Sequence, residues 1–525
     1  MPKSPSPCSL LCAVAGLAVS LAMIVAMAAC GGSSSSTSSS GGGNPPPSGD
    51  CTQPAPVTAA STGKAPVNPG VVTFTDLHMG SSNLPWPAGP NGQPVPFGGL
   101  RLWDTGTGWA QINTAEKVFD FSSIDAFAMV AQTNNVDLLY NLARTPTWAS
   151  SNPTDSTCSY DTSTQGGPGQ CDPPVDLNSD GSGTDADWIA WITALAQHNA
   201  TSPYAHIKYY EIWNEWNIQL FWNPSTGTIP ELVRMEQDAR CVVEGPPPGK
   251  QCNPNSTFPS GTGLDPEAQI VSPSPVGAGS SSTTLNAVAS NLTNYYNATV
   301  NGYPGGSFAD NVGFHGYVGT PSTTTPIYCP IPENVTIVLG NLYNAVNGTS
   351  LSGKPWFDTE SGWSKAESEE FIDPDRQDAF LPRYMLLQWS MGVDRMYWYR
   401  WDETQEYGGA LWNATTGPIE AVTAWQEVSK WMVGASMNSC APLVTSSTQD
   451  VWACSITRPS GYQALAVWDA AQDCLNGSCT TSTFNIPNNV TYTEYRDIAG
   501  NESSVTGSTI AVGAKPILLE TGPLP

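Results

Sequence analysis

Short apolar runs alternate with longer amphipathic stretches over most of the chain, between about Val71 and Asp402. The short runs predict β-strands, and the stretches between them carry apolar residues at helical spacing. The predicted strands are Val71–Leu77, Leu100–Trp103, Asp137–Asn141, Lys208–Ile212, Gln269–Val271, Asn311–Phe314, Pro355–Asp358 and Arg395–Tyr399. The predicted helical segments are Ile124–Ala131, Trp188–Leu195, Leu232–Val243, Thr284–Ala298, Val335–Val346 and Arg376–Ser390.

Eight strands alternating with about seven or eight helices over about 330 residues is the count expected of an α/β fold of the (β/α)8 TIM barrel type. A doubly wound open sheet gives a similar rhythm, so the pattern alone leaves both architectures open. Beyond about Ala424 the pattern changes to short β-branched and aromatic segments separated by turn signals, which predicts a C-terminal all-β sandwich domain. The segments are Val451–Ile456, Tyr462–Asp469, Ser482–Ile486, Val490–Arg496, Thr509–Val512 and Pro516–Glu520.

The N-terminus has the pattern of a secretory signal: Lys3, then an apolar run that ends in small residues before Cys30. This Cys resembles the lipidated cysteine of a bacterial lipobox. The alternatives are an ordinary signal peptide with an incidental Cys, or a retained anchor. Gly- and Ser-rich residues follow and predict a disordered tether. The expected organisation is a signal peptide over 1–29, a lipidated tether over 30–51, the barrel over 52–423 and the sandwich over 424–525.

Composition narrows the class of protein. Hydrophobic residues make up 40% of the chain, enough for a substantial core, whereas only 12% are charged. That charged fraction is well below the roughly 25% of typical soluble proteins, and a surface of neutral polar groups fits an extracellular protein. The net charge of −26 argues against nucleic-acid binding, which needs a basic patch. It favours a neutral or basic substrate.

Of the 13 Cys, two leave with the signal and Cys30 would carry lipid, so ten remain. An even number in an exported chain predicts disulfides. Proximity in the sequence pairs Cys158–Cys171, Cys241–Cys252, Cys440–Cys454 and Cys474–Cys479, and leaves Cys51 with Cys329. No Cys or His cluster has zinc-site spacing, so we expect no structural metal.

The strongest chemical signal lies where the predicted fourth strand runs into Trp213-Asn214-Glu215. Barrel strands deliver side chains to the active-site face at their carboxyl ends. Glycosidic cleavage needs a proton donor, and a carboxyl group near aromatic surface keeps its proton near neutral pH. Glu215 is therefore the expected general acid, and Asn214 is placed to bind a sugar hydroxyl.

A second short strand ends in Asp358-Thr359-Glu360. By count it is the seventh strand, so its end can face Glu215 across the mouth of a closed barrel. A retaining glycosidase needs two carboxyl groups about 5–5.5 Å apart, one as nucleophile and one as acid/base. Glu360 is the expected nucleophile. Asp358 is its rival, because strand alternation places both acids on one face.

Together these motifs resemble glycoside hydrolase clan A, whose acid/base ends strand four and whose nucleophile ends strand seven. The resemblance assigns roles to further residues. It implies that Arg101 keeps the nucleophile ionised and that Tyr317 of His315-Gly316-Tyr317 contacts the nucleophile. It also implies that Trp398 forms the floor of the subsite that binds the cleaved sugar. Arg101-Leu102-Trp103-Asp104 with the later Trp148 segment is most similar to family 39, with families 5, 30 and 79 as alternatives. Family 39 includes β-xylosidases, iduronidases and exopolysaccharide-cleaving enzymes.

Nineteen Trp support a carbohydrate ligand, because sugar rings stack on indoles. Trp148, Trp363 and His78 are candidate subsite residues, although each could equally fill the core. Arg144 and Asp104 are either substrate contacts or an ion pair. The resemblance implies hydrolysis by double displacement without a cofactor, with a carbohydrate and, through Cys30, a membrane as partners. A transglycosylase using the same residues and an inactive carbohydrate-binding lipoprotein are the alternatives.

Overall fold

The computed structural model describes most of the chain beyond the N-terminal region. The described residues are 57–58, 72–74, 86–158, 167–258, 263–277, 286–318, 332–363, 373–403, 410–413, 415–446 and 448–525. The predictions for the signal peptide, the tether with Cys30, His78 and the Cys51–Cys329 pair lie outside these residues. Within them, no helix has the length and apolar character needed to cross a bilayer.

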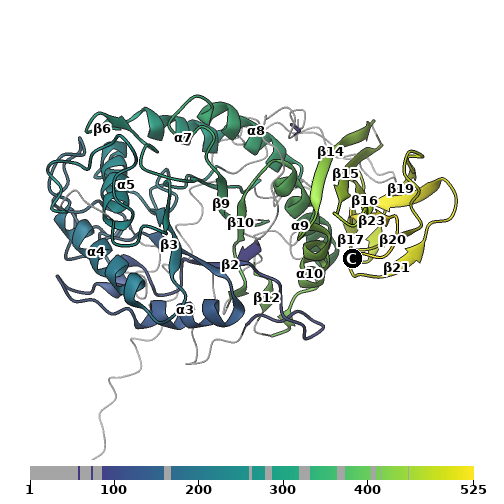
Figure 1. Ribbon diagram of the computed structural model, residues 1–525, viewed down its shortest axis with the longest axis horizontal. Coiled ribbons are helices and arrows are strands. Elements are labelled where there is room, and N and C mark those ends of the chain that lie inside the picture. The colour runs from purple at the N-terminus through teal and green to yellow at the C-terminus, as the bar shows by residue number, and fades with distance from the viewer. Residues whose placement is uncertain are drawn as a thin grey trace, which may run out of the picture. The chain divides into compact units, whose positions relative to one another are not determined.

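Eight parallel strands form the central sheet (Figure 1). Their bounds are β1 Val72–Phe74, β2 Gly99–Leu102, β3 Asp137–Leu142, β4 Ile207–Ile212, β5 Gln269–Val271, β8 Val312–His315, β9 Trp356–Ser361 and β10 Arg395–Trp398. They neighbour one another in the order β5-β4-β3-β2-β1-β10-β9-β8. Isolated parallel bridges join Val271 to Asn311 and Val276 to His315, so strands β5 and β8, at the two ends of this order, are also neighbours. All eight strands predicted from the sequence are confirmed.

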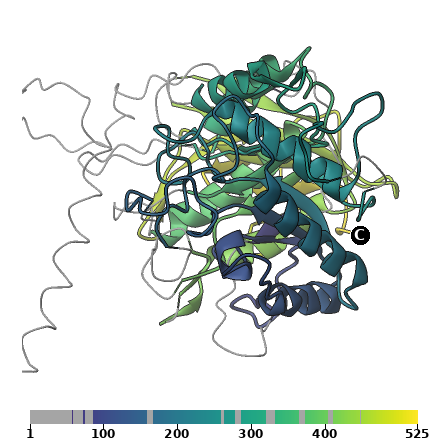
Figure 2. The ribbon, with the colours of Figure 1, turned by 90° about the vertical axis from the view of Figure 1, so that its left-hand side faces the viewer.

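Helices alternate with these strands along the chain and lie around them (Figures 1 and 2). Their bounds are α2 Trp109–Ile112, α3 Ser122–Asn134, α4 Ala186–Thr201, α5 Ile229–Val243, α7 Ala287–Asn297, α8 Asn334–Val346, α9 Pro374–Ser390 and α10 Ala421–Met432. The apolar stripe predicted from Trp188 to Leu195 is buried on α4. Helix α5 begins with a capping box, in which Thr228 and Glu231 each accept the other's backbone N–H. The helical segments predicted from the sequence are confirmed.

Strands β2, β8 and β9 are buried at every position. Their apolar residues, such as Leu100, Phe314 and Trp356, mark them in the sequence as short buried strands. Burial also makes their polar residues conspicuous, since a buried charge or polar group is costly unless another group satisfies it. Arg101, His315, Asp358 and Glu360 are the titratable residues to which this applies, and each must find its partners inside the protein.

An antiparallel sheet follows α10, which crosses the expected domain boundary between residues 423 and 424. Its six strands have the order β14-β15-β16-β23-β20-β21, and β19 pairs separately with β22. The bounds are β14 Ser436–Thr445, β15 Asp450–Thr457, β16 Gln463–Asp469, β19 Thr481–Asn485, β20 Glu494–Arg496, β21 Glu502–Ser504, β22 Thr509–Gly513 and β23 Ile517–Glu520. Val451 and Val467 of the larger sheet pack in one apolar cluster with Phe484 and Val512 of the β19–β22 pair.

The opposite face of the six-stranded sheet contacts the helices of the central sheet. Trp452 and Trp468 stack on this face, and the indole of Trp468 donates to Glu333 at 2.6 Å. Glu333 lies at the start of α8 and also pairs with Arg383 of α9. Shorter strands complete the structure: β6 Thr299–Val300, β7 Tyr303–Pro304, β11 Asp402–Glu403, β12 Trp412–Asn413, β13 Gly417–Pro418, β17 Cys474–Leu475 and β18 Ser478–Cys479.

Four of the predicted disulfides are confirmed. They are Cys158–Cys171, Cys241–Cys252, Cys440–Cys454 and Cys474–Cys479. Each closes a short loop, with 5 to 14 residues of sequence separation. Disulfides persist in oxidising surroundings, so these bonds are compatible with a protein that works outside the cytoplasm.

Candidate active site

Side chains at the carboxyl ends of β4 and β9 converge on Arg101 of β2. Its Nε donates to Glu211 of β4 at 2.7 Å, and its Nη1 donates to Glu360 of β9 at 2.7 Å. Its Nη2 donates to the side-chain oxygen of Asn214, also at 2.7 Å. Burial would lower the pKa of Arg101, but the charges of Glu211 and Glu360 outweigh this and raise it. Arg101 is therefore a fixed cation between two carboxyl groups.

Glu360 is held by donors on both of its oxygens. Oε2 accepts from Arg101, and Oε1 accepts the hydroxyl of Tyr317 at 3.0 Å. The residue is only 6% exposed. Burial raises the pKa of Glu360, and the charge of Arg101 works against that rise. Hydrogen bonds donated to a carboxylate favour its charged form, so this environment favours Glu360 as the ionised member of the pair.

Glu215 has a different environment, without a cation in hydrogen-bond contact in the described structure. Its Oε1 lies 2.8 Å from Nδ1 of His315. Burial raises the pKa of Glu215 to about 8, although Arg101 opposes the rise, and the negative charge of Glu211 adds to it. Burial also lowers the pKa of His315, to about 4, so the imidazole is neutral near pH 7. Glu215 is therefore the carboxyl group that holds a proton there.

The two carboxyl groups lie close to each other. One oxygen of Glu215, one oxygen of Glu360 and a ring nitrogen of His315 all lie within 4.8 Å of one another. This is the range in which the two carboxyl groups of a retaining glycosidase act on one sugar, about 5–5.5 Å apart. The backbone at Glu215 has a φ of 38°, a region that non-glycine residues rarely occupy. Such strain is characteristic of functional sites.

Asp358, the alternative nucleophile, contacts different residues from those that Glu360 contacts. Its carboxyl group accepts from the backbone N–H of Gly316 at 2.8 Å and from Tyr384 and Gln388 of α9. The pairing of β8 with β9 shifts register, because Phe314 pairs with Asp358 and His315 pairs with Glu360. This irregularity breaks the alternation that placed both acids on one face. In the structure Asp358 contacts α9, whereas Glu360 contacts Arg101.

The remaining predicted site residues divide into two groups. Asn214 belongs to the Arg101 network, and its side-chain NH₂ group is buried with no acceptor among the described residues. Trp363 and Trp398 are both 0% exposed and meet edge to face, with ring centroids 4.7 Å apart. The half-buried Trp148 donates to the carbonyl of Asn113 at 2.8 Å. A subsite role for these three Trp stays a prediction.

Arg144 and Asp104 form an ion pair with each other. The guanidinium carbon of Arg144 also lies 4.0 Å from the centroid of the Trp103 ring, and Tyr399 donates to Asp104 at 2.9 Å. Of the two roles left open by the sequence, the structure therefore supports the ion pair. Both residues have positive φ angles, as Glu215 does, and both follow strands of the central sheet.

Three buried residues that no sequence argument assigned complete the network. Glu211 accepts from Arg101, from Asn141 at 2.8 Å and from Ser274 at 2.6 Å. Burial raises the pKa of Glu211, but the charge of Arg101 outweighs this and the net direction is down. The signal available in the sequence was the carboxyl group itself, because a Glu inside an apolar strand requires a buried cation.

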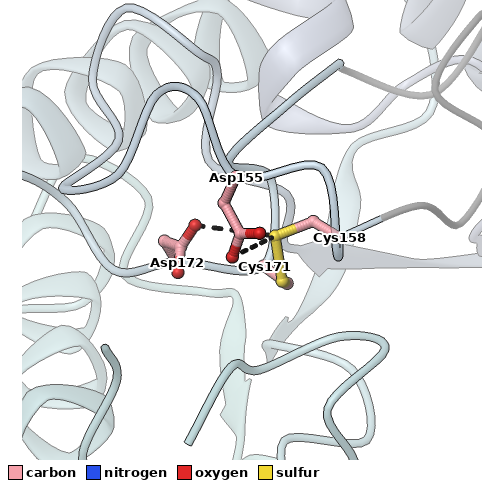
Figure 3. A group of neighbouring side chains, drawn as sticks. All are labelled: Asp155, Cys158, Cys171 and Asp172. Atoms are coloured by element: carbon pink, nitrogen blue, oxygen red, sulfur yellow. Dashed lines mark hydrogen bonds between the residues drawn. A yellow bond between two sulfur atoms is a disulfide. The ribbon is translucent and has the colours of Figure 1, made fainter. Parts of the chain in front are cut away.

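Acidic residues lie beside Cys in two places where side chains could hold a metal ion. Asp155, Cys158, Cys171 and Asp172 lie together (Figure 3). The two sulfurs form a disulfide, however, so neither is a thiolate that could bind a metal. Burial raises the pKa of Asp172 to about 6, and it lies against Asp155. The same objection applies to Asp375 with the Cys474–Cys479 disulfide.

Comparisons with known proteins support the fold. No protein-family profile and no curated protein matches the chain. Among solved structures, a family 39 glycoside hydrolase from Bacteroides cellulosilyticus WH2 is similar with a TM-score of 0.51 and 14% identity, over 87% of this chain and 81% of that one. A monomeric beta-xylosidase from Caulobacter crescentus CB15 is similar with a TM-score of 0.50 and 12% identity, over 87% and 97%. The chain thus shares the fold of solved glycoside hydrolases.

Proposed function

We propose that this protein is a retaining glycoside hydrolase built on a (β/α)8 barrel, with Glu360 as nucleophile and Glu215 as general acid/base. The observation that carries the proposal is the asymmetry between two carboxyl groups within 4.8 Å of each other. Glu360 accepts from Arg101 and Tyr317, which stabilise a carboxylate. Glu215 instead contacts Nδ1 of the neutral His315, and its pKa of about 8 keeps it protonated. One acid and one base at this spacing are the two groups that the reaction needs.

In the first step the carboxylate of Glu360 attacks the anomeric carbon and forms an ester with the sugar. The bond from that carbon to the leaving oxygen breaks, and the leaving oxygen takes the proton of Glu215. Arg101 and Tyr317 hold the attacking group in position. The proton donor and the nucleophile thus act on the same bond at the same time.

In the second step the carboxylate of Glu215 takes a proton from water. The oxygen of that water attacks the anomeric carbon, the ester bond breaks, and Glu360 leaves as a carboxylate. Two displacements at the same carbon retain its configuration. The buried NH₂ group of Asn214 is available to donate to a sugar hydroxyl beside the reacting carbon.

For the substrate we propose a β-linked oligo- or polysaccharide. The two similar structures are described as a family 39 glycoside hydrolase and a beta-xylosidase, which favours β-glycosides. A net charge of −26 favours a neutral sugar over an anionic one. The four disulfides favour action outside the cytoplasm, where a lipid on Cys30 would tether the enzyme to a membrane.

A screen of aryl β-glycosides and polysaccharides tests the proposal. The wild type should release product from at least one β-glycoside, and Glu360→Ala should abolish the release. Glu215→Ala should recover turnover of an activated aryl glycoside when azide is added, because azide needs no general base. Glu236→Ala is the matched control, since Glu236 is a buried acid on α5 that bonds Tyr295 and lies outside the network. Full turnover by Glu360→Ala would overturn the assignment.

A further inference from the structure

The segment from Asp176 to Asp187, between β3 and α4, has a pattern that the proposed glycosidase does not use. Its sequence is Asp-Leu-Asn-Ser-Asp-Gly-Ser-Gly-Thr-Asp-Ala-Asp. Calcium loops of the EF-hand type follow the pattern Asp-x-Asp/Asn-x-Asp/Asn-Gly, then five residues and an acid. They offer oxygen ligands at positions 1, 3, 5, 7, 9 and 12, with glycine at position 6. The segment satisfies each of these positions, with Asp in place of Glu at position 12.

The backbone turns where the pattern requires it. Gly181, at position 6, has a φ of 77°, and the space around it excludes a side chain, since a Cβ there would lie 2.8 Å from the carbonyl oxygen of Pro230. Leu177 bridges Gly183 in antiparallel fashion, so the segment folds back on itself. Helix α4 begins at Ala186, as the exit helix of a calcium loop does. Asp187 therefore lies in the first helical turn.

Four of the side chains at the ligand positions contact one another in two pairs. The hydroxyl of Thr184 donates to Asp176 at 2.8 Å, which joins positions 9 and 1. Asn178 donates to the hydroxyl of Ser182 at 2.9 Å, which joins positions 3 and 7. Asp180 accepts the backbone N–H of Ser182 at 2.9 Å. All of these groups carry an oxygen atom on the same short turn.

Buried oxygens in this segment lack donors. Asp185 is 0% exposed, and no donor among the described residues reaches either of its carboxylate oxygens. Oδ1 of Asp176 is likewise buried without a partner there. Oδ1 of Asp176 and both oxygens of Asp185 are therefore buried without a donor among the described residues, whereas Oδ2 of Asp176 accepts from Thr184 and from the backbone N–H of Ala186.

The positively charged side chain of Arg234 contacts the segment, but it binds backbone carbonyls and not the side chains at the ligand positions. The buried guanidinium of Arg234, on α5, donates to the carbonyls of Gly181 at 3.1 Å and Gly183 at 3.0 Å, and to Asp238 at 2.6 Å. Among the described residues, the carbonyl of Ser182, at position 7, accepts one backbone hydrogen bond, from Asn178, and a carbonyl oxygen has a second lone pair. Arg234 thus fixes the backbone without using the side-chain oxygens.

We propose that the segment 176–187 binds a calcium ion. The ligands would be the side chains of Asp176, Asn178, Asp180 and Asp187 with the carbonyl of Ser182, and Thr184 would act directly or through water. An all-oxygen set with several carboxylates selects a hard cation, and a flexible set of six or more suits Ca²⁺ better than the smaller Mg²⁺. The expectation of no structural metal rested on Cys and His spacing, which does not concern oxygen ligands.

Calcium titration of the full-length protein after chelator treatment tests this inference by calorimetry. The wild type should bind one Ca²⁺ with a dissociation constant between about 10⁻⁷ and 10⁻³ M, the range of such loops. Asp180→Asn keeps an oxygen at position 5, which is exposed, but removes one negative charge from the ligand set, and it should weaken binding by about tenfold or more, as even changes at indirect partners of metal ligands do. Calcium should raise the Tm of the wild type and raise that of the variant less.

Asp120→Asn is the matched control, because Asp120 is also exposed and also accepts the N–H of a serine two residues on, at 3.0 Å. It should bind calcium as the wild type does. No calcium uptake by the wild type up to about 10 mM, beyond the weakest such loops, would overturn the proposal. Equal affinity of Asp180→Asn and Asp120→Asn would overturn it too, because the ion would then bind elsewhere. Neither readout depends on glycosidase activity.

Discussion

Replacing Arg101 by Met is the most informative perturbation of the site. The substitution keeps an unbranched side chain but removes the cation and its three hydrogen bonds, to Glu211, Glu360 and Asn214. Two buried carboxyl groups would then lose their shared partner. Breaking a buried ion pair from one side costs about 3–5 kcal/mol of stability, because the remaining charge is left uncompensated.

The catalytic consequence is a change in pH dependence. An arginine in contact with a carboxyl group lowers its pKa by about 1–3 pH units, so its removal should raise the pKa of Glu360 by that amount. A nucleophile must be ionised, and a higher pKa means that it is ionised only at higher pH. The acidic limb of the kcat/KM profile should therefore move up by about 1–3 pH units.

The assay is the pH profile of kcat/KM on an aryl β-glycoside that the wild type hydrolyses, together with thermal unfolding. Arg383→Met is the control, because Arg383 also pairs with a buried glutamate, Glu333, but outside the site. Both variants should lose stability, and only Arg101→Met should move the acidic limb. An acidic limb that stays in place in Arg101→Met would refute the role assigned to Arg101.

Three further predictions follow from the same network. With a pKa of about 8 for Glu215, kcat/KM should fall as the pH rises through about 8, and Glu215→Gln should remove this basic limb from the profile. Asn214→Ala should lower kcat/KM by about 5- to 150-fold, the equivalent of about 1–3 kcal/mol, and should affect a 2-deoxy substrate less, which steady-state kinetics can compare. Asp358→Asn should retain at least about a tenth of the wild-type kcat, whereas Glu360→Gln should lose on the order of 10³-fold or more; similar losses in both would contradict the placement of Asp358.

The central strands could be predicted because buried strands appear in the sequence as short runs of mostly apolar residues. A parallel strand covered on both faces is apolar at most positions, as β3 shows with five buried residues from Leu138 to Leu142, of which four are apolar or aromatic. The strand β14, Ser436–Thr445, escaped prediction because it is mostly exposed and contains polar residues and a proline. Its place in the sheet is set by pairing with β15, a contact that a local pattern does not encode.

The site was only partly predictable for the same reason. Glu215 and Glu360 stood out because each ends an apolar strand. The role of Glu211 did not, because its partner Arg101 lies 110 residues away in the chain. The alternation rule also failed at Asp358, since the register shift between β8 and β9 depends on how two strands meet. Pairings between distant strands are properties of the fold, and they had to come from the structure.

The central claim, that Glu360 forms a covalent bond to the sugar, can be tested by trapping that bond. A 2-deoxy-2-fluoro β-glycoside with a good leaving group should form the ester quickly and hydrolyse it slowly, because fluorine destabilises both transition states and the leaving group speeds only the first step. Mass spectrometry of the digested protein should then find the added sugar on Glu360. An adduct on Asp358 or Glu215, or an inverted product without any adduct, would contradict the account.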